Sequence, residues 1–440
     1  MEPVVVAAVQ RIWSISMSQK ARQTSPHPSP VGQASTSTRL GLGVALLGTK
    51  FMGRAHSNAW GKCAQFFELK RPPRMIVAAG RNAAETDAFA QRWGWSRAST
   101  DWREVLQDGD VDLVDVSTPN HLHAEMSIAS LEAGKHVACE KPLSSTLADA
   151  KRMVLAARAA KKKGIQTFVW FNYRRCGAVA LAHRLVKEGK LGRIFHVRAS
   201  YLQDWGGPDT PLLWRFQSDQ AGSGAHGDLN AHLIDMARFI TGDEIVDVVG
   251  AIEETFIKER AIVAANTEAL GASKKLKGNK ASAKRSGKST VDDAVLFLAR
   301  FKHGAIASFE ATRLATGNQN RNMIEINGEY GSVKFDFERM NELQWWDHTL
   351  EAKLRGWSRI MCTDASHPYG GHYWPAAHVV GYEHGFVSQA ADIAAVLGGG
   401  ASIVPLPDFE DALKTQCVLE AAIRSAREHR AVPIRELDKF

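Results

Sequence analysis

The sequence has no run of about 18 apolar residues, so it predicts no segment that spans a membrane. Cysteine is scarce: five occur among 440 residues, and none belongs to a C-x-x-C pair. Their scatter predicts neither a zinc site nor a disulfide framework. We therefore expect free thiols and a reducing, cytoplasmic location. The five are Cys63, Cys139, Cys176, Cys362 and Cys417.

Acidic residues are missing from two segments, Gly271–Ser289 and Ser16–Arg39. The net charge of +8 would suit nucleic acid, but Gly271–Ser289 alone holds seven Lys and Arg and no acid. We interpret residues 271–289 as a solvated, mobile insertion and expect no nucleic-acid partner. The alternative is a loop that docks an anion or a partner. Residues 1–40 are interpreted as a disordered tail or the product of a start codon placed too early, with Met17 as the alternative start. Export is the remaining alternative.

The rest of the chain is ordinary for a globular protein, with 45% apolar and 23% charged residues, and its length favours two domains. From Leu42 onward, strand-like and helix-like segments alternate, which predicts a parallel sheet with crossover helices. The expected strands are VALL (Val44–Leu47), RMIVAAG, VDLVDVSTP, HVACEKP and IQTFVWFNYRR. Ligands bind where the ends of such strands meet.

The first turn, LGTKFMG, carries a glycine fingerprint with one substitution. Gly48 and Gly53 occupy the outer positions, but Lys50 stands where a glycine normally lets a pyrophosphate approach the backbone. We interpret the turn as real because it opens a regular series of β–α units. The Lys50 side chain is expected to turn outward; alternatively, its ammonium contacts a phosphate.

Two further stretches carry chemistry. Glu140–Lys141–Pro142 follows a strand and places a lysine where it could exchange protons with a hydroxyl, although a surface salt bridge is an equal alternative. In the helix that ends at Gly242, Asp228 lies one turn before His232, so we expect the carboxylate to orient the imidazole. The alternative is a histidine that is only part of the core.

The segments GTKFMGRAHSNAW, STPNHLHAE, AGKHVACEKPLS, FNYRR and GDLNAHLIDMARFITG together resemble the glucose–fructose oxidoreductase/inositol dehydrogenase (Gfo/Idh/MocA) family. The motifs AHSNAW, YLQDW, WRFQ and SHPYG are similar to those of sugar dehydrogenases of the levoglucosan-dehydrogenase type. The resemblance implies an α/β fold: a Rossmann dinucleotide-binding domain at residues 41–167, then an α+β domain at 168–440. The second domain would have an open-faced, mostly antiparallel sheet, which in the family makes homodimers or homotetramers.

The resemblance also implies roles for single residues. Lys141, followed by a cis proline at Pro142, would hydrogen-bond the reacting hydroxyl, and His232 would be the general base that Asp228 orients. The residues expected to bind the cofactor are Gly48, Thr49, Lys50, Phe51, Met52, Gly53, Arg81, Thr118, Pro119, Asn120, His123, Glu140, Lys141 and Asn172. Those expected to bind substrate are Lys141, Tyr173, Arg174, Asp204, Trp205, Trp214, Arg215, Asp228 and His232.

The second half of the chain fits a carbohydrate site. Segments such as RIFHVRASYL, DAVLFLARF, AIASFEATR, NMIEINGE and SVKFDFER alternate like half-buried strands. Tyr201, Gln203 and the aromatic residues near them combine flat rings with directional hydrogen-bonding groups, although they could equally be core and surface aromatics. The spacing of His367, His372, His378 and His384 matches no metal-ligand pattern, so no metal is expected.

The cofactor is expected to be NAD or NADP. The second strand ends in AAGRN, without an acid for the ribose 2′-hydroxyl, and Arg81 could accommodate a 2′-phosphate instead. Three functions follow. The leading hypothesis is an NAD(P)-dependent dehydrogenase of a pyranose or polyol. The second is a glycosidase that oxidises C3 transiently and eliminates across C2, with Tyr173 as the added base. The third is a non-catalytic sugar or nucleotide sensor.

Overall fold

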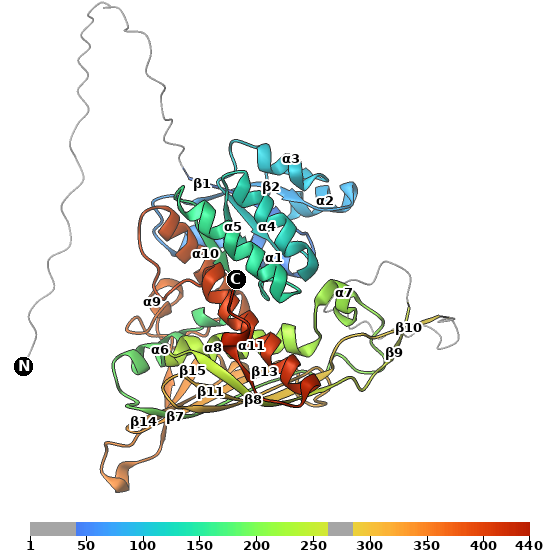
Figure 1. Cartoon of the computed structure of the whole chain (residues 1–440). Coiled ribbons are helices and arrows are strands. Elements are labelled where there is room, and N and C mark those ends of the chain that lie inside the picture. Colours follow the sequence, from blue (N-terminus) through green and yellow to red (C-terminus); the bar gives the residue numbers. More distant parts are fainter. Residues whose placement is uncertain (1–40, 263–284) are drawn as a thin grey trace, which may run out of the picture. The chain divides into compact units, whose positions relative to one another are not determined.

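A computed structural model describes residues 41–262 and 285–440 (Figure 1). The expected N-terminal tail and most of the expected basic insertion lie outside these residues. The last residues of that insertion are ordered, contrary to the expectation of a mobile segment. Ser286–Lys288 form strand β10, which pairs in antiparallel fashion with β9 (Glu259–Ala261). Among the described residues, no helix has both the length and the apolar character needed to cross a membrane.

The first half forms a six-stranded parallel sheet in the order β3-β2-β1-β4-β5-β6. Strands β1 and β4 are buried along their whole length, which explains why the sequence reads as continuous apolar runs there. The strands are β1 (Leu42–Leu47), β2 (Pro73–Ala79), β3 (Arg97–Ser99), β4 (Leu113–Val116), β5 (His136–Cys139) and β6 (Thr167–Val169). This sheet confirms the expected Rossmann fold.

Local signals in the sequence fix the helices between these strands. Asn82 and Thr146 cap two of them by accepting hydrogen bonds from the backbone N–H three residues on, and Gly94 ends one in the left-handed conformation. The helices are α1 (Phe51–Phe66), α2 (Ala83–Trp93), α3 (Trp102–Gln107), α4 (His123–Glu132) and α5 (Leu147–Lys161), with the short turn η1 (Asn120–Leu122) before α4.

The fifth expected strand is shorter than its apolar run. β6 ends at Val169, beyond the expected domain boundary at residue 167, and the chain then turns into η2 (Asn172–Arg175). The later chain also returns to the first domain, because α10 (Tyr382–Leu397) packs on α1 and α11 (Phe409–Glu428) packs on α5. The two domains therefore do not divide the chain at a single point.

The second half builds a nine-stranded sheet in the order β16-β15-β14-β13-β7-β12-β11-β8-β17. Only the β7–β12 pair is parallel, so the expected mostly antiparallel sheet is confirmed. The strands are β7 (Ile194–Leu202), β8 (Ile245–Glu254), β11 (Ala294–Phe301), β12 (Ile306–Thr312), β13 (Arg321–Gly328), β14 (Gly331–Asp336), β15 (Glu342–Asp347), β16 (Trp357–Met361) and β17 (Val432–Pro433).

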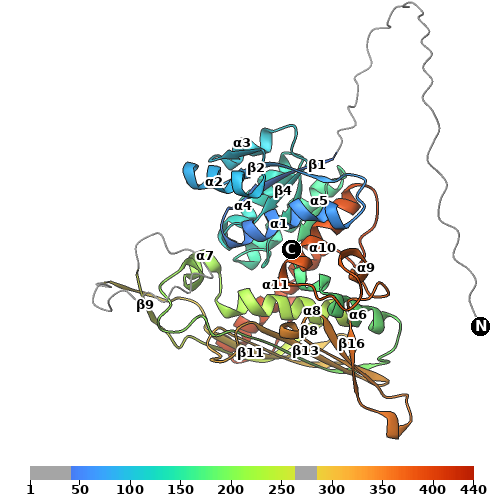
Figure 2. The ribbon, with the colours of Figure 1, turned by 180° about the vertical axis from the view of Figure 1, so that it is seen from behind.

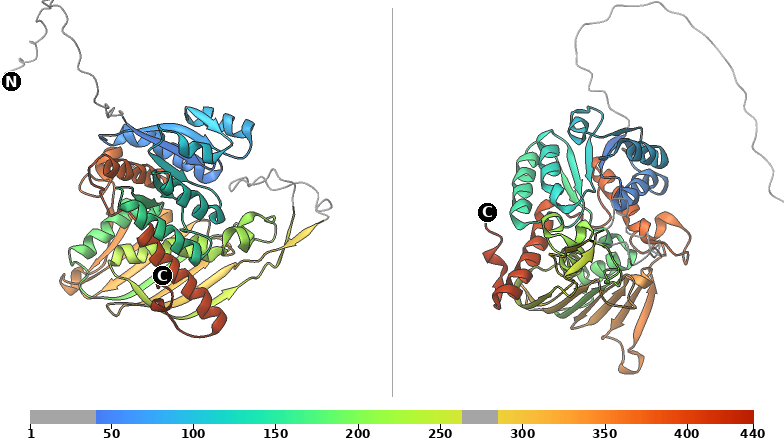
Figure 3. Two further views of the ribbon diagram at one scale, coloured as in Figure 1. Left: turned by 45° about the horizontal axis from the view of Figure 1, so that its top comes forward. Right: turned by 90° about the vertical axis from the view of Figure 1, so that its right-hand side faces the viewer.

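Helices cover one face of this sheet and leave the other face open (Figures 2 and 3). Along β11, Val295 and Phe297 point to the covered face and are buried. Leu298 points to the opposite, open face and is 57% exposed. The remaining helices are α6 (Gly177–Lys187), α7 (Ser218–Ala221), α8 (Ala231–Thr241) and α9 (Gly370–Tyr373). The short turns are η3 (Trp214–Phe216), the π-helical η4 (His226–Asn230), η5 (Phe337–Arg339), η6 (Ala352–Leu354) and η7 (Ile434–Glu436).

Candidate active site

A cavity of about 1040 Å³ opens at the carboxyl ends of β1, β2, β4 and β5. Both sheets belong to one unit, Leu40–Phe440, and the cavity lies between the first sheet and residues of the second half of the chain. The strand order of this doubly wound sheet reverses between β1 and β4, and ligands bind at this switch point in such sheets. Most residues expected to bind cofactor line it: Gly48, Thr49, Lys50, Phe51, Met52, Arg81, Thr118, Pro119, Asn120, Glu140, Lys141 and Asn172.

The opening turn has the steric form that the glycine pattern predicts. Gly48 has a φ of +110°, and a Cβ there would lie 2.8 Å from the Ser117 carbonyl oxygen. A Cβ on Gly53 would lie 2.2 Å from the Gly48 carbonyl oxygen. The Lys50 ammonium lies 3.0 Å from the exposed Glu85 carboxylate, and both residues line the cavity, so its outward orientation stays a prediction. The first turn of α1 has no side-chain cap, so its backbone N–H groups suit a dinucleotide phosphate.

Four residues expected to contact ligands do not line the cavity, and these assignments are corrected. Gly53 packs on Gly48 within the turn, and both ring nitrogens of His123 lie 3.0 Å from the carbonyl oxygens of Pro142 and Thr118. Asp204 is exposed, and its carboxylate accepts only a long, 3.4 Å hydrogen bond from the Gly317 N–H. Arg174 is turned into the protein interior.

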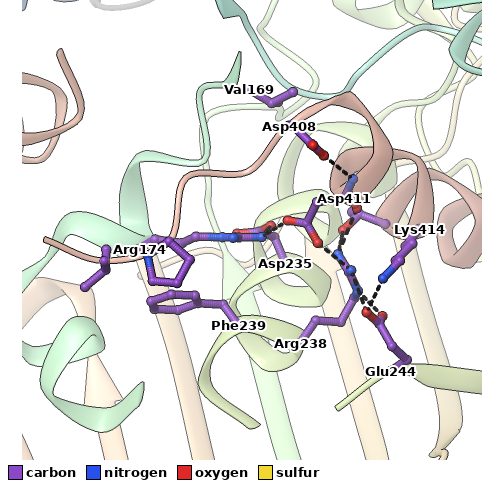
Figure 4. Close-up of polar contacts among 12 residues, drawn as sticks. Val169, Arg174, Asp235, Arg238, Phe239, Glu244, Asp408, Asp411 and Lys414 are labelled. Carbon is purple, nitrogen blue, oxygen red and sulfur yellow. Dashed lines mark hydrogen bonds and ion pairs between the residues drawn. The ribbon is translucent and has the colours of Figure 1, made fainter. Parts of the chain in front are cut away.

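Arg174 belongs to a buried ion network (Figure 4). Its guanidinium pairs with Asp235 of α8 and Asp411 of α11. Asp411 also binds Arg238, with 2.7 Å between Oδ1 and Nη2, and Arg238 binds Glu244. Successive residues of η2 point in different directions, so Asn172 and Tyr173 face the cavity while Arg174 ties η2 to α8 and α11.

Of the residues expected to bind substrate, those that line the cavity are Lys141, Tyr173, Trp205, Trp214, Arg215, Asp228 and His232. The ammonium of Lys141 lies 2.8 Å from Asp228 Oδ1 and 2.9 Å from the Asp228 carbonyl oxygen. An ammonium has three donors, so one N–H of Lys141 remains for a ligand. The Lys141–Pro142 peptide bond is cis, as the resemblance implied.

Asp228 holds the lysine rather than the histidine. Its second carboxylate oxygen accepts a hydrogen bond from Arg313 Nη2 at 2.9 Å. Burial alone would raise the pKa of Asp228, but Lys141, Arg313 and Arg215 hold it well below its usual range. The expectation that Asp228 orients His232 is wrong. Asp228 lies in the π-helical turn η4, whose wider spiral moves residues four apart out of line.

His232 lies at the start of α8 inside an aromatic cage. Its Nδ1 is buried without a hydrogen-bond partner, and the Tyr173 ring packs edge-on with its centroid 4.6 Å away. Burial and the nearby Lys141 ammonium push the pKa of His232 well below its usual range. The imidazole is therefore neutral at physiological pH and is able to accept a proton.

A row of hydrogen bonds forms one wall of the cavity. The Tyr201 hydroxyl donates to Asn320 Oδ1 at 2.7 Å, so the Tyr173 hydroxyl, 2.7 Å from that of Tyr201, donates to Tyr201. Gln203 Nε2 donates to the same Asn320 oxygen at 2.7 Å, and Trp205 Nε1 donates to Gln203 Oε1 at 2.6 Å. The expected aromatic and polar cluster therefore lines the cavity, apart from Asp204.

Sequence reasoning missed a buried cluster behind Glu140. His56 Nδ1 lies 3.0 Å from Asp115 Oδ1, and His56 Nε2 lies 3.0 Å from Glu140 Oε1. Ionised carboxylates only accept hydrogen bonds, so both ring nitrogens must carry protons. Burial alone would lower the pKa of His56, but the two carboxylates raise it to about 9. Glu140 Oε2 in turn accepts a hydrogen bond from the backbone N–H of Lys141 at 3.0 Å. This bond holds the backbone of Lys141 in place just after β5.

Arg313, Asn320 and Tyr382 were also missed, although they line the cavity. Arg313 directly follows β12, Asn320 directly precedes β13 and Tyr382 begins α10, and no local motif marks these positions. Within residues 41–262 and 285–440, no three His, Cys, Asp or Glu side chains are arranged to hold a metal ion.

Comparison with known proteins identifies the class of protein. The profile of the oxidoreductase family with an NAD-binding Rossmann fold matches residues 42–169, and that of the GFO/IDH/MocA C-terminal domain matches residues 179–334. The chain belongs to the Gfo/Idh/MocA family of oxidoreductases. Its first domain is a Rossmann domain for a nicotinamide dinucleotide, which fits the turn at Gly48 and the uncapped start of α1.

Particular relatives are similar over nearly the whole chain. Levoglucosan dehydrogenase of Pseudarthrobacter phenanthrenivorans is 40% identical over 400 residues, which cover 90% of this chain and 99% of the relative. A solved oxidoreductase domain protein from Kribbella flavida is 46% identical with a TM-score of 0.82, over 90% of this chain and 99% of that one. A levoglucosan dehydrogenase structure with NADH and levoglucosan is 40% identical, with a TM-score of 0.80 over the same shares.

Proposed function

We propose that this protein is an NAD(P)-dependent dehydrogenase that oxidises a hydroxyl group of a pyranose sugar or polyol. The observation that carries the proposal is the meeting of Lys141, from a strand end of the first domain, and His232, from a helix of the second, at one cavity. The 40% identity to levoglucosan dehydrogenase supports a sugar as the substrate class.

The residues divide the chemistry between them. The bound nicotinamide supplies the hydride acceptor. Lys141 has one N–H left after its two bonds to Asp228, and it donates this N–H to the reacting hydroxyl oxygen. The neutral His232 takes the proton of that hydroxyl, while the C–H bond gives up its electron pair as hydride and a carbonyl forms. Asp228, held by Lys141 and Arg313, keeps the ammonium aimed at the oxygen.

The test is kinetic. Lys141→Ala and His232→Ala should each lower kcat by roughly two to four orders of magnitude. The double variant should lose much less than the sum of the two effects, because residues that act as a unit are not additive. Cofactor binding, followed by fluorescence of the reduced cofactor, should survive in all three. Lys62→Ala and His303→Ala, whose side chains do not line the cavity, are the matched controls. Near-normal turnover in His232→Ala would refute the mechanism.

Redox-neutral glycoside cleavage would need a base for the C2 proton. Tyr173 was the candidate, but its hydroxyl is buried and donates to Tyr201, and burial raises its pKa well above the usual range. This favours net oxidation. Aryl glycosides assayed for reduced cofactor and for released aglycone together distinguish the two: aglycone without reduced cofactor would favour cleavage. A sensor without activity would be favoured if no sugar reduced the cofactor.

Three finer points belong to the same proposal. NAD is supported by the NADH bound in the levoglucosan dehydrogenase structure, and NADP by Arg81 at the end of β2 in place of an acid. The open sheet face, with Ile252, Leu298 and Ile306 each at least half exposed, is proposed to pair with a second copy of the chain. Leu298→Glu should then lower the mass measured by light scattering.

The five buried free cysteines support a cytoplasmic location.

A further inference from the structure

Arg215 stands out among the charged residues that line the cavity. It lies in η3, and its guanidinium carbon is 4.4 Å from the centroid of the Trp214 ring. Within the described part of the chain, no hydrogen bond or ion pair involves its side chain. The neighbouring cations are different, because Lys141 and Arg313 both bind the carboxylate of Asp228.

The charges around Arg215 do not balance. Arg215, Lys141 and Arg313 face a single carboxylate, Asp228, on this side of the cavity. The other nearby acid, Glu140, shares the His56 imidazolium with Asp115 and makes no bond to Arg215 among the described residues. Burial lowers the pKa of Arg215 to about 10 against the opposing influence of the Asp228 carboxylate, and the side chain is half-buried at the cavity. An oxidised nicotinamide would bring a further positive charge.

We infer that Arg215 binds an oxyanion of the substrate, so that the sugar oxidised by this enzyme carries an acidic group. The inference rests on the proposed dehydrogenase function. A guanidinium offers a planar fork of N–H donors that matches a carboxylate in two parallel hydrogen bonds. Stacking on Trp214 holds the plane of the fork in place before the ligand arrives. A sugar carboxylate is therefore the best match, and sulfonate and phosphate share the same chemistry.

The competing occupant is a pair of neutral sugar hydroxyls, which the same fork could also bind. Hydroxyls would satisfy the donors but leave the half-buried guanidinium without an anion of its own. The two occupants differ in one measurable property, namely whether removing the charge of the ligand at constant shape weakens its binding.

The experiment compares glucuronate with its methyl ester, which keeps the shape and removes the charge. Kd for each is measured on the full chain with bound cofactor by tryptophan fluorescence, and kcat and KM are measured by formation of reduced cofactor. Glucose, 6-deoxy-6-sulfoglucose and glucose 6-phosphate form further arms, which identify the oxyanion. The variants are Arg215→Gln and Arg215→Lys, with the exposed Arg92→Gln of α2 as the matched control.

In the wild type, an acidic sugar should bind roughly 30- to 100-fold more tightly than its neutral counterpart, as expected for a charge-assisted pair. Arg215→Gln should abolish this preference through KM, with kcat nearly unchanged, and Arg215→Lys should keep part of it. Thermal melting should change by only a small amount, because the side chain makes no hydrogen bond or ion pair among the described residues and loses only its stacking on Trp214. Equal binding of acid and ester, or an equal loss of both in Arg215→Gln, would overturn the inference.

The binding and turnover measurements test the acidic ligand of Arg215 and the dehydrogenase activity separately. Arg215-dependent binding of an acidic sugar without turnover of any sugar would leave the inference standing and refute the dehydrogenase. Turnover of neutral sugars that is indifferent to Arg215→Gln would do the reverse.

Discussion

The stability of the protein should fall as pH rises from neutral to alkaline values, because His56 is an imidazolium in the folded state. Its ring is buried between the Asp115 and Glu140 carboxylates and stacks on Trp170, with centroids 4.2 Å apart. Folding raises its pKa from 6.5 to about 9. The stabilisation is therefore fully present below pH 6.5, and it is lost as the pH rises through about 9.

The magnitude follows from the size of the shift. A displacement of about two and a half pKa units corresponds to about 3 kcal/mol of the free energy of unfolding. The entropy of unfolding for a unit the size of Leu40–Phe440 is about 0.8 kcal/mol per kelvin, so 3 kcal/mol corresponds to about 4 °C in Tm.

The assay is thermal melting of the wild type and His56→Gln between about pH 6 and about pH 10. The advantage of the wild type over His56→Gln should shrink by about 4 °C across this range, while other titrations cancel in the difference. His303→Gln is the control, because His303 pairs with Asp243 on the surface with its side chain 75% exposed, and such pairs contribute little. A difference between wild type and His56→Gln that did not change with pH would show that the buried imidazole is neutral.

Three further predictions concern other parts of the site and its support. Asp228→Asn should lower kcat by about ten- to a hundredfold, less than Lys141→Ala, because the Asp228 carbonyl still holds the ammonium; additive losses in the double variant would contradict this coupling. Arg81→Ala should raise the Kd of NADP more than that of NAD, since only NADP has a 2′-phosphate, and an equal rise would refute that role. Asp411→Asn should cost about 2–4 kcal/mol in urea unfolding, because it leaves Arg174 and Arg238 short of a partner. Glu410→Gln, which breaks only an exposed pair with Arg158, should cost less than about 1 kcal/mol, and similar losses in the two variants would contradict the network.

The first sheet could be predicted because each β–α unit is specified locally. Apolar runs give the strands, Asn82 and Thr146 cap helices, and Gly94 ends one, so nearby residues determine each element. The predicted end of a strand was wrong where the apolar run continues beyond the last paired residue. TFVWF reads as one strand, but only Thr167–Val169 pairs with β5, and Trp170 and Phe171 are buried beyond it.

Partners within the site could not be predicted, because they come from distant parts of the chain. Asp228 was paired with His232 since helical spacing is the one relation that a sequence displays directly. Its actual partners, Lys141 and Arg313, are 87 and 85 positions away. The resemblance assigned Arg174 to substrate together with Tyr173, but its charge is neutralised by Asp235 and Asp411.

These long-range pairings also set the protonation states that the chemistry needs. The Lys141 ammonium lowers the pKa of Asp228, which keeps that carboxylate ionised, and it also lowers the pKa of His232, which keeps the imidazole neutral. A hydrogen bond from His232 to Asp228 would have favoured the imidazolium instead, and a protonated imidazole cannot accept the proton of a substrate hydroxyl. Because Asp228 is occupied by two cations, the proposed donor, Lys141, and the proposed acceptor, His232, coexist in one cavity at the same pH. The correction to the predicted Asp228–His232 pair thus strengthens the case for His232 as the base.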